Sequence, residues 1–211
     1  MAETKKYRTI ITYKNYFEDF LTRQREKVKE KIFWIFLLIE EVQHVPETYL
    51  KHLEGTDGLY EIRIQFASDI FRIFCFFDEG KLVVLANGFQ KKTQKTPKTD
   101  IVKAQKKRRN IMKTKNNIKT LAQLIDEQYG KKGTPKRDRF DKGYQTFKLG
   151  AMIHEARLEK GLTQEQLASK CGTNKAYISK VENDVKDVRI STLQKIIEVG
   201  LGGRLNLSVT L

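Results

Sequence analysis

The sequence contains few residues of the kinds that hold metals or form disulfides. It has two cysteines, Cys75 and Cys171, each inside a separate apolar pattern, so neither a disulfide framework nor a thiolate zinc cluster can be assembled. The three histidines, His44, His52 and His154, lack metal-ligand spacing. Glycine-rich phosphate loops and Gly-x-Ser-x-Gly elbows are also missing. We therefore expect no metal and no cofactor, and most common enzyme chemistries are excluded.

Long hydrophobic runs are missing as well. The longest uninterrupted apolar run, Ile32 to Ile39, has eight residues. A membrane-spanning helix needs about 20 apolar residues. No signal-peptide pattern opens the chain. These observations predict a cytoplasmic protein without a membrane partner.

Positive charge is what the chain has in excess. It carries 41 basic and 26 acidic side chains over 211 residues, a formal net charge of +15. Residues 1–111 hold 22 basic and 15 acidic side chains, and residues 112–211 hold 19 and 11, so both halves are cationic. Neutralising phosphates releases counterions, which supplies most sequence-independent affinity for nucleic acid. The charge favours a nucleic-acid partner over a merely soluble basic protein.

The first half predicts a small antiparallel sheet with helices. A first strand is expected over Tyr7 to Tyr13, followed by two helices that end near Pro46. Three strand-like segments then alternate with short loops, which predicts antiparallel neighbours. A further helix closes this half. The three segments and the helix are Leu59 to Phe66, Ile70 to Asp78, Leu82 to Phe89 and Lys98 to about Arg109.

Strict alternation in the first of these segments separates two faces. Tyr60, Ile62, Ile64 and Phe66 share one face, which leaves Glu61, Arg63 and Gln65 on a face expected to be wet. Arg63 and Arg72 share a face, at diagonal positions, if the intervening loop has an even length.

The second half predicts mainly helices. The densest basic stretch, Lys103 to Lys115, indicates a domain boundary, and an amphipathic helix follows over residues 118–129. Residues 149–199 are expected to form helices of eight to twelve residues, with a short final strand from Arg204 to Leu211. Capping boxes are predicted at Thr163–Gln166 and Ser191–Gln194. The whole chain is therefore expected to be α+β, with a small antiparallel sheet and helices in the first domain and an all-α second domain.

A motif in the second half carries a specific resemblance. Gly-Leu-Thr-Gln-Glu-Gln-Leu-Ala at residues 161–168, followed by Tyr-Ile-Ser-Lys-Val-Glu-Asn at residues 177–183, resembles the XRE/Cro family of helix-turn-helix repressors. The resemblance covers residues 149–199 and implies that the helix over residues 174–183 enters the DNA major groove. It places Lys175, Ala176 and Lys180 at base edges, and Gln164, Asn174, Tyr177 and Asn183 at phosphate or sugar.

The motif departs from the family pattern at two positions, and its lysines have an alternative interpretation. Ala176 replaces a longer polar residue and offers only a methyl-type contact, and Asp184 replaces the usual glycine after the helix. Lysine donors suit guanine O6 and N7, so guanines are expected in each half-site. The alternative is that Lys175 and Lys180 are only a solvated helix face.

Three segments of the first half carry a second resemblance. Leu-Tyr-Glu-Ile-Arg at residues 59–63, Phe-Arg-Ile-Phe at residues 71–74 and Asn-Gly-Phe-Gln-Lys-Lys-Thr-Gln-Lys-Thr-Pro at residues 87–97 resemble HigB-type toxins of the RelE/ParE superfamily. Those relatives imply a messenger RNA interferase that acts on the ribosome. Lys-Gly-Thr-Pro at residues 132–135, with the helix-turn-helix, resembles the HigA-type antitoxin, and the order of the two halves matches as well.

RNA cleavage by a 2′-hydroxyl needs phosphate binding, stabilisation of the charge on phosphorus, and two proton transfers. A metal-free cationic site would use Arg63 and Arg72 for the charge, and Lys91 and Lys92 for proton transfer. His52 is a further acid or base candidate, although a lone histidine is more often structural. Lys95 and Phe89 are candidates for RNA binding. The alternatives are surface charges for the arginines, simple phosphate binding for the lysines and a core position for Phe89.

The resemblances together imply a type II toxin–antitoxin module. We expect a toxin domain over residues 1–111, an antitoxin segment over residues 112–147 that covers the toxin, and a DNA-binding domain over residues 148–211. The expected partners are messenger RNA, operator DNA and a second copy of the chain. A decayed toxin domain on a non-catalytic repressor, and a ParE-like inhibitor of DNA gyrase, stay open, as does a pair of joined polypeptides in which Met112 begins the second.

Overall fold

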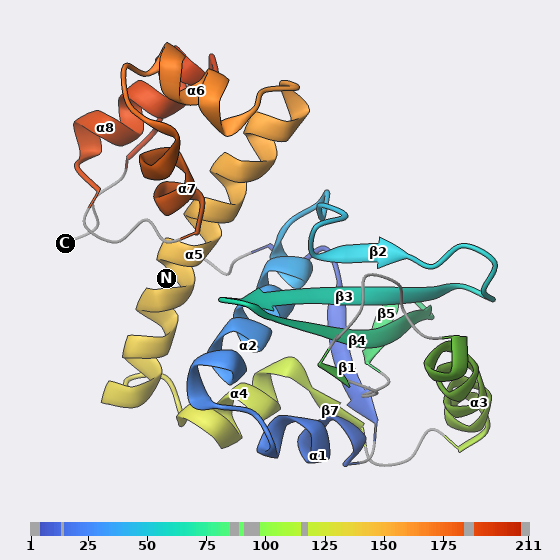
Figure 1. The fold of residues 1–211 in the computed structure, drawn as a ribbon. Coiled ribbons are helices and arrows are strands. Elements are labelled where there is room, and N and C mark those ends of the chain that lie inside the picture. The colour runs from blue at the N-terminus through green and yellow to red at the C-terminus, as the bar shows by residue number, and fades with distance from the viewer. Residues whose placement is uncertain are drawn as a thin grey trace. The chain divides into compact units, whose positions relative to one another are not determined.

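The structure is a computed structural model that describes residues 5–13, 15–84, 89–90, 98–114, 118–183 and 188–207. The chain divides into two compact units, Met1–Arg137 and Asp138–Leu211. The first unit is a sheet with helices, and the second consists of helices (Figure 1). The fold class is α+β, as the sequence predicts. Within the described residues, no helix is both long and apolar enough to span a membrane.

The first unit is built on one mixed sheet. Its described strands follow the order β2-β3-β4-β5-β1-β7, and β6 pairs with β4. The antiparallel neighbours expected among β3, β4 and β5 are confirmed, but the sheet as a whole is mixed, because β1 pairs with β5 in parallel. The strands are β1 Thr9–Tyr13, β2 Leu50–His52, β3 Leu59–Phe66, β4 Asp69–Asp78, β5 Lys81–Val84, β6 Phe89–Gln90 and β7 Ile118–Thr120.

Helices pack against both faces of this sheet. Leu59, Phe74 and Phe76 lie on one face and form a core cluster with Ala104 and Ile111 of α3, Lys98–Thr114. The alternate residues of β3 and β4 lie on the other face. There the helix α2, Glu26–Glu41, contacts β3 and β1, and the short helix α1, Tyr16–Thr22, also contacts β1.

Residues 118–129 differ from the single helix expected for them. Ile118 to Thr120 form β7, which pairs antiparallel with β1, and α4 begins only at Leu121 and ends at Tyr129. The change follows from Thr120, whose side chain accepts from Gln123 N while the Gln123 side chain accepts from Thr120 N. A capping box of this kind fixes a helix start.

The helix α4 is a layer of the first unit. It buries Leu121, Leu124, Ile125 and Tyr129, and it contacts α2 and β1. The Tyr129 ring meets the Phe33 ring of α2 edge-on at 5.7 Å between centroids. The sheet and core of the first unit therefore extend past residue 111 to β7 and α4 (Figure 1).

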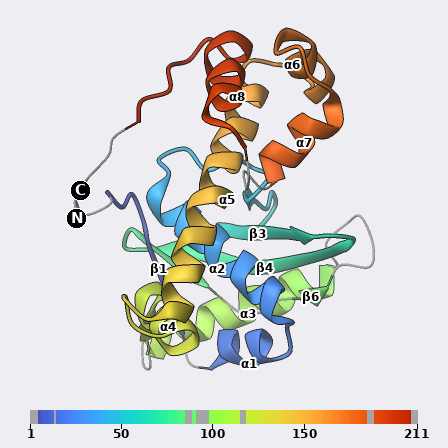
Figure 2. The same cartoon turned by 90° about the vertical axis from the view of Figure 1, so that its left-hand side faces the viewer.

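The second unit is a cluster of short helices around the C-terminal part of α5 (Figure 2). The helix α5, Pro135–Glu159, begins in the first unit and is longer than the eight to twelve residues expected. It is followed by α6 Gln164–Lys170, α7 Lys175–Asn183, α8 Ile190–Gln194 and a π-helix, Lys195–Gly200. Their shared core is formed by Ile153, Leu167, Ala168, Cys171, Ile178, Val181, Leu193, Ile196 and Leu201.

Two expectations for the end of the chain differ from what the described residues show. Residues 204–207 form no strand in the described part of the chain, and residues 208–211 lie outside it. The capping box at Ser191–Gln194 is not formed, because α8 begins two residues earlier than that box requires, at Ile190, with Arg189 as its cap residue and no side-chain cap bond. The box at Thr163–Gln166 is confirmed.

Replacing Ile125 by alanine tests whether α4 is part of the first unit. Ile125 is 2% exposed, and truncating a buried isoleucine leaves a cavity. We expect the free energy of unfolding of the first unit to fall by about 3 kcal/mol. Trp34, the single tryptophan of the chain, lies in α2, so its fluorescence during urea unfolding reports on this unit alone.

Ala122→Ser is the matched control, because Ala122 is exposed on the same helix. The control is expected to stay within about 0.5 kcal/mol of the parent chain. An Ile125→Ala chain as stable as the control would show that α4 contributes nothing to the first unit.

Candidate nucleic-acid interfaces

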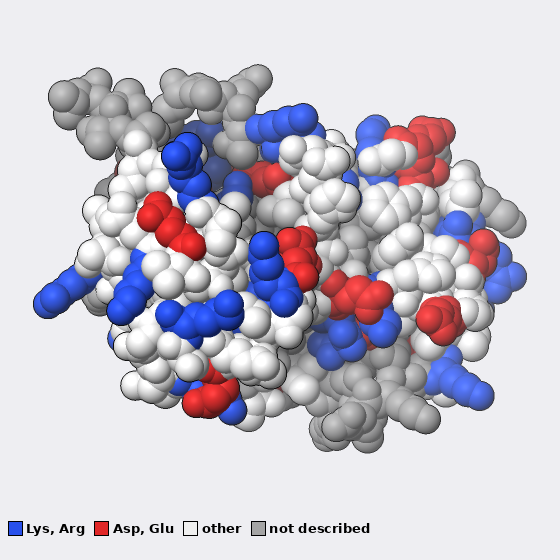
Figure 3. Space-filling model, turned by 90° about the horizontal axis from the view of Figure 1, so that it is seen from above, with Lys and Arg blue, Asp and Glu red and all other residues white. Residues whose placement is uncertain are grey.

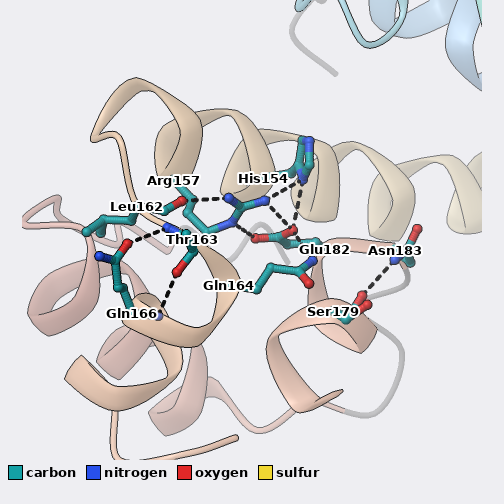
Figure 4. Close-up of polar contacts among 9 residues, drawn as sticks. All are labelled: His154, Arg157, Leu162, Thr163, Gln164, Gln166, Ser179, Glu182 and Asn183. Atoms are coloured by element: carbon teal, nitrogen blue, oxygen red, sulfur yellow. Dashed lines mark hydrogen bonds and ion pairs between the residues drawn. The ribbon is translucent and has the colours of Figure 1, made fainter. Parts of the chain in front are cut away.

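A buried carboxylate links three helices of the second unit. Glu182 of α7 is 5% exposed and contacts three side chains (Figure 4). Its Oε1 accepts from Arg157 Nε at 2.5 Å, and its Oε2 accepts from Arg157 Nη2 at 3.0 Å and from Gln164 Nε2 at 2.9 Å. His154 Nδ1 lies 2.8 Å from the same Oε2. Arg157 also donates to the Leu162 carbonyl, so α5, α6 and the turn between them are held against α7.

This network keeps Glu182 ionised. Burial alone would raise the pKa of the Glu182 carboxyl, but the hydrogen bonds from His154, Arg157 and Gln164 outweigh that effect and lower the pKa to about 2. A buried carboxylate that stays charged needs such partners. The negative charge of Glu182 therefore fixes the position of α7 relative to α5 and α6.

Close backbone packing accompanies the network. A Cβ atom added to Gly150 of α5 would lie 2.8 Å from the carbonyl oxygens of Val181 and Glu182. Since real Cβ atoms do not approach oxygen so closely, only glycine allows α5 and α7 to pack at this distance.

The outer face of α7 carries exposed side chains. Lys175, Ala176 and Lys180 are exposed, whereas Ile178 and Val181 are fully buried in the core. The same helix therefore packs with one face and presents two lysines with the other.

Three further polar side chains of the motif are ordered by the backbone or the core. Asn174 Oδ1 accepts from Tyr177 N at 2.8 Å at the start of α7. Asn183 Nδ2 donates to the Ser179 carbonyl (Figure 4). The Tyr177 side chain is partly buried against the core.

Two arginines face each other on the sheet of the first unit. The register pairs Arg63 of β3 directly with Arg72 of β4, so they are direct neighbours and not diagonal ones. Between them lies Glu61, which is 2% exposed. Its Oε1 is 2.9 Å from Arg72 Nε and 3.2 Å from Arg63 Nε. One buried carboxylate therefore holds two guanidinium groups on one face.

The two arginines differ in exposure. The Arg63 side chain is 31% exposed and donates to the Glu47 carbonyl at 3.3 Å. The Arg72 side chain is 10% exposed and donates to the Phe71 carbonyl at 2.9 Å. Burial lowers the pKa of Arg72, and the neighbouring Glu61 charge opposes that shift. A guanidinium group carries the positive charge that phosphate binding requires.

The two units match different family models. Residues 153–199 match the family described as Helix-turn-helix. Residues 19–109 match the family described as Phage derived protein Gp49-like. No curated protein matches this chain. The protein therefore joins a Gp49-like domain to a helix-turn-helix domain, and the second match supports DNA binding.

Within the Gp49-like domain, the structure brings together only part of the expected site. Arg63 and Arg72 lie together. The backbone of Phe89 in β6 pairs with that of Arg72 in β4. Lys91, Lys92 and Lys95 lie outside the described residues.

His52 does not join the arginines. It pairs with Tyr60 across β2 and β3, and the two rings are 5.0 Å apart. Because side chains alternate along a strand, Tyr60 and His52 lie on the face opposite to Arg63. The structure therefore separates His52 from the Arg63–Arg72 pair.

Sequence reasoning missed Glu61 as a site residue. Alternation correctly placed it beside Arg63, but the face was expected to be wet, whereas Glu61 and Arg72 are buried there. The available signal was an acidic residue two positions before one arginine and on the same strand face.

In the helix-turn-helix domain, the seven residues expected at DNA all lie on α7 or at the starts of α6 and α7, whereas Asp184 lies outside the described residues. Figure 3 shows lysine and arginine side chains spread over the face in view, with acidic side chains among them. The described residues of this face therefore form no continuous basic patch, and nucleic-acid binding there would depend on where individual lysines and arginines lie.

Replacing Glu182 by glutamine tests the network through its pH dependence. The Glu182 pKa is lowered in the folded state from an ordinary 4.5 to about 2. The stability it contributes is therefore fully present above about pH 4.5 and is lost as the pH falls towards 2. Glu182→Gln should lower the stability of the second unit at neutral pH by up to about 3 kcal/mol.

The difference from the parent chain should close as the pH falls from about 4.5 to about 2. Urea unfolding followed by NMR amide signals of α6 and α7 measures it. Glu165→Gln, an exposed carboxylate in the first turn of α6, is the control. A gap that is independent of pH would contradict the ionised network.

Proposed function

We propose that this chain is a type II toxin–antitoxin module in one polypeptide. The helix-turn-helix domain binds operator DNA and represses its own promoter, and the Gp49-like domain cleaves messenger RNA on the ribosome. The combination of the two domain matches in one chain supports the first part. The Arg63–Arg72 pair on one sheet face supports the second.

For DNA, the exposed face of α7 supplies the donors. Lys175 and Lys180 can reach guanine O6 and N7 in the major groove, and the exposed Ala176 can pack against a thymine methyl group. The Glu182 network positions this face by holding α7 against α5 and α6.

Side-chain amides supply the phosphate contacts in this proposal. An amide nitrogen carries two donors. Gln164 Nε2 gives one to Glu182, and Asn183 Nδ2 gives one to the Ser179 carbonyl, which leaves a second donor on each for a phosphate oxygen. A second copy of the chain would place the same helix in the next half-site of a palindrome.

For RNA, the arginines stabilise charge in a metal-free displacement. The 2′-oxygen forms a bond to phosphorus as the bond to the 5′-oxygen breaks. The 2′-hydroxyl loses its proton to a base, and the leaving 5′-oxygen gains one. Negative charge accumulates on the phosphorus oxygens in the transition state, which is where guanidinium donors act. Lys91 and Lys92 are proposed for the proton transfers, with Lys95 and Phe89 for RNA binding.

Neutralisation was expected from residues 112–147. Of these, residues 118–129 form β7 and α4 next to β1, with β5 and β1 between them and β4. They do not shield Arg63 and Arg72. We assign neutralisation to the part of this segment that belongs to the second unit, residues 138–147, acting in cis or from a second copy.

Single lysine substitutions test the DNA-binding helix. Lys175→Ala and Lys180→Ala should each weaken binding to a duplex selected by the parent chain from a random pool, by about tenfold at a fixed salt concentration. Lys170→Ala, an exposed lysine at the end of α6, is the control and should leave the affinity unchanged. Electrophoretic mobility shifts measure the affinities. If all three substitutions weakened binding equally, Lys175 and Lys180 would contribute only non-specific electrostatic attraction and would not contact bases.

Transcript mapping tests the RNA arm. Bacteria would express the full chain, the first unit ending at Arg137, and each of them with Arg72→Ala. We expect clustered new 5′ ends within translated codons for the first unit, and an about hundredfold or larger loss of them with Arg72→Ala, because the transition-state charge loses a donor. The full chain should show few. The control is Arg23→Ala, because Arg23 is exposed at the end of α1. A first unit with this substitution should cut messenger RNA normally.

Two results would replace the RNA arm. Growth arrest with intact transcripts would support inhibition of DNA gyrase. Normal growth with both the full chain and the first unit would mark a decayed toxin domain on a working repressor.

A further inference from the structure

The Glu61 carboxylate is more deeply buried than either arginine beside it. Its side chain is 3% exposed, against 10% for Arg72 and 31% for Arg63. Burying a carboxylate is costly unless charged partners surround it. A fold that needed only a filled sheet face would place an apolar side chain at this position, as β3 and β4 do at Leu59 and Phe74 on the same face. The carboxylate therefore has a task that an apolar residue could not perform.

The contacts of Glu61 select one edge of each guanidinium. In both arginines the atom near Glu61 Oε1 is Nε. The Nη1 atoms are used as well, by the Glu47 carbonyl for Arg63 and by the Phe71 carbonyl for Arg72. Within the part of the chain that the structure describes, Nη2 of neither arginine has a hydrogen-bond partner. Arg63 Nε donates a hydrogen bond to Glu61 Oε1, whereas Arg72 Nε forms an ion pair with it but no hydrogen bond. Each guanidinium thus has its Nε edge beside Glu61 and keeps donors at the other edge.

We propose that Glu61 is a positioning residue that fixes the Arg63 and Arg72 guanidinium groups with their Nη2 ends directed at a phosphate of RNA. This inference rests on the RNA-binding part of the proposed function. Glu61 itself does not meet the phosphate, because two like charges repel. It acts through the arginines.

Charge and alignment oppose each other in this arrangement, which makes the role measurable. Glu61 cancels one of the two positive charges of the cluster, so its removal strengthens general attraction for RNA. The same removal releases the Nε edges and the orientation that they impose. A residue that only stabilised the fold would weaken folding and binding together and would not separate these two effects.

The test uses the full chain and a short single-stranded RNA with 2′-O-methyl groups, which cannot be cleaved. Variants are Glu61→Gln, Glu61→Asp and the control Glu54→Gln, which removes one exposed carboxylate from the loop after β2. Fluorescence anisotropy over a series of salt concentrations gives the salt slope of binding. Arginine Nε–H NMR signals, assigned through Arg63→Ala and Arg72→Ala, report the guanidinium contacts.

For Glu61→Gln we expect a salt slope steeper by about 0.7, the value for one additional neutralised phosphate of a single strand. The protected Nε–H signal of Arg63, which donates to Glu61 in the parent chain, should be lost to exchange with water. Glu61→Asp keeps the charge and should keep the parent slope, and Glu54→Gln should change neither reading.

The inference is overturned if Glu61→Gln keeps the Nε–H protection, if its slope equals that of Glu54→Gln, or if RNA binding by the parent chain does not depend on Arg63 and Arg72. A chain that binds RNA through these arginines but never cuts it would refute the nuclease and retain the role of Glu61. The two proposals therefore fail separately.

Discussion

An arginine that is taken out of water needs a carboxylate beside it, because an unpaired charge costs several kcal/mol in a protein interior. The Arg63–Arg72 pair meets this requirement through Glu61. One oxygen of its carboxylate, Oε1, lies within 3.2 Å of both Nε atoms. Two arginines directly opposite each other on adjacent strands would otherwise repel. Glu61 therefore offsets this repulsion at the only described place where two guanidinium groups of the first unit share a sheet face.

A buried carboxylate also neutralises an arginine in the second unit, where it positions a helix instead of a pair of strands. Glu182 joins Arg157, His154 and Gln164, and it holds α7 so that its lysines face solvent. In both units a basic chain buries only those arginines that a carboxylate neutralises. Lys175 and Lys180 of the candidate DNA interface are exposed, where nucleic acid can reach them.

The sequence was sufficient for elements whose signal is local. β3 follows from alternation, β4 from a strand-like segment between short loops, and the α6 start from the capping box at Thr163. The exposed lysines of α7 follow from the spacing of Ile178 and Val181. Elements that depend on distant partners could not be predicted in this way. β7 exists because β1 offers an open edge over one hundred residues earlier in the chain, and β2 is too short to show a period of two. The burial of Glu61 needs the arginine of the next strand, and the separation of His52 needs the β2 register.

The central claim is that each unit presents one surface to nucleic acid, the β3–β4 face to RNA and α7 to DNA. The most direct measurement is NMR mapping of the isotopically labelled full chain with a short single-stranded RNA and, separately, with a duplex that the chain binds. The account predicts that RNA shifts the signals of Arg63, Arg72 and their strand neighbours, whereas the duplex shifts those of Lys175 and Lys180. RNA-induced shifts confined to α7, or none on β3 and β4, would contradict it.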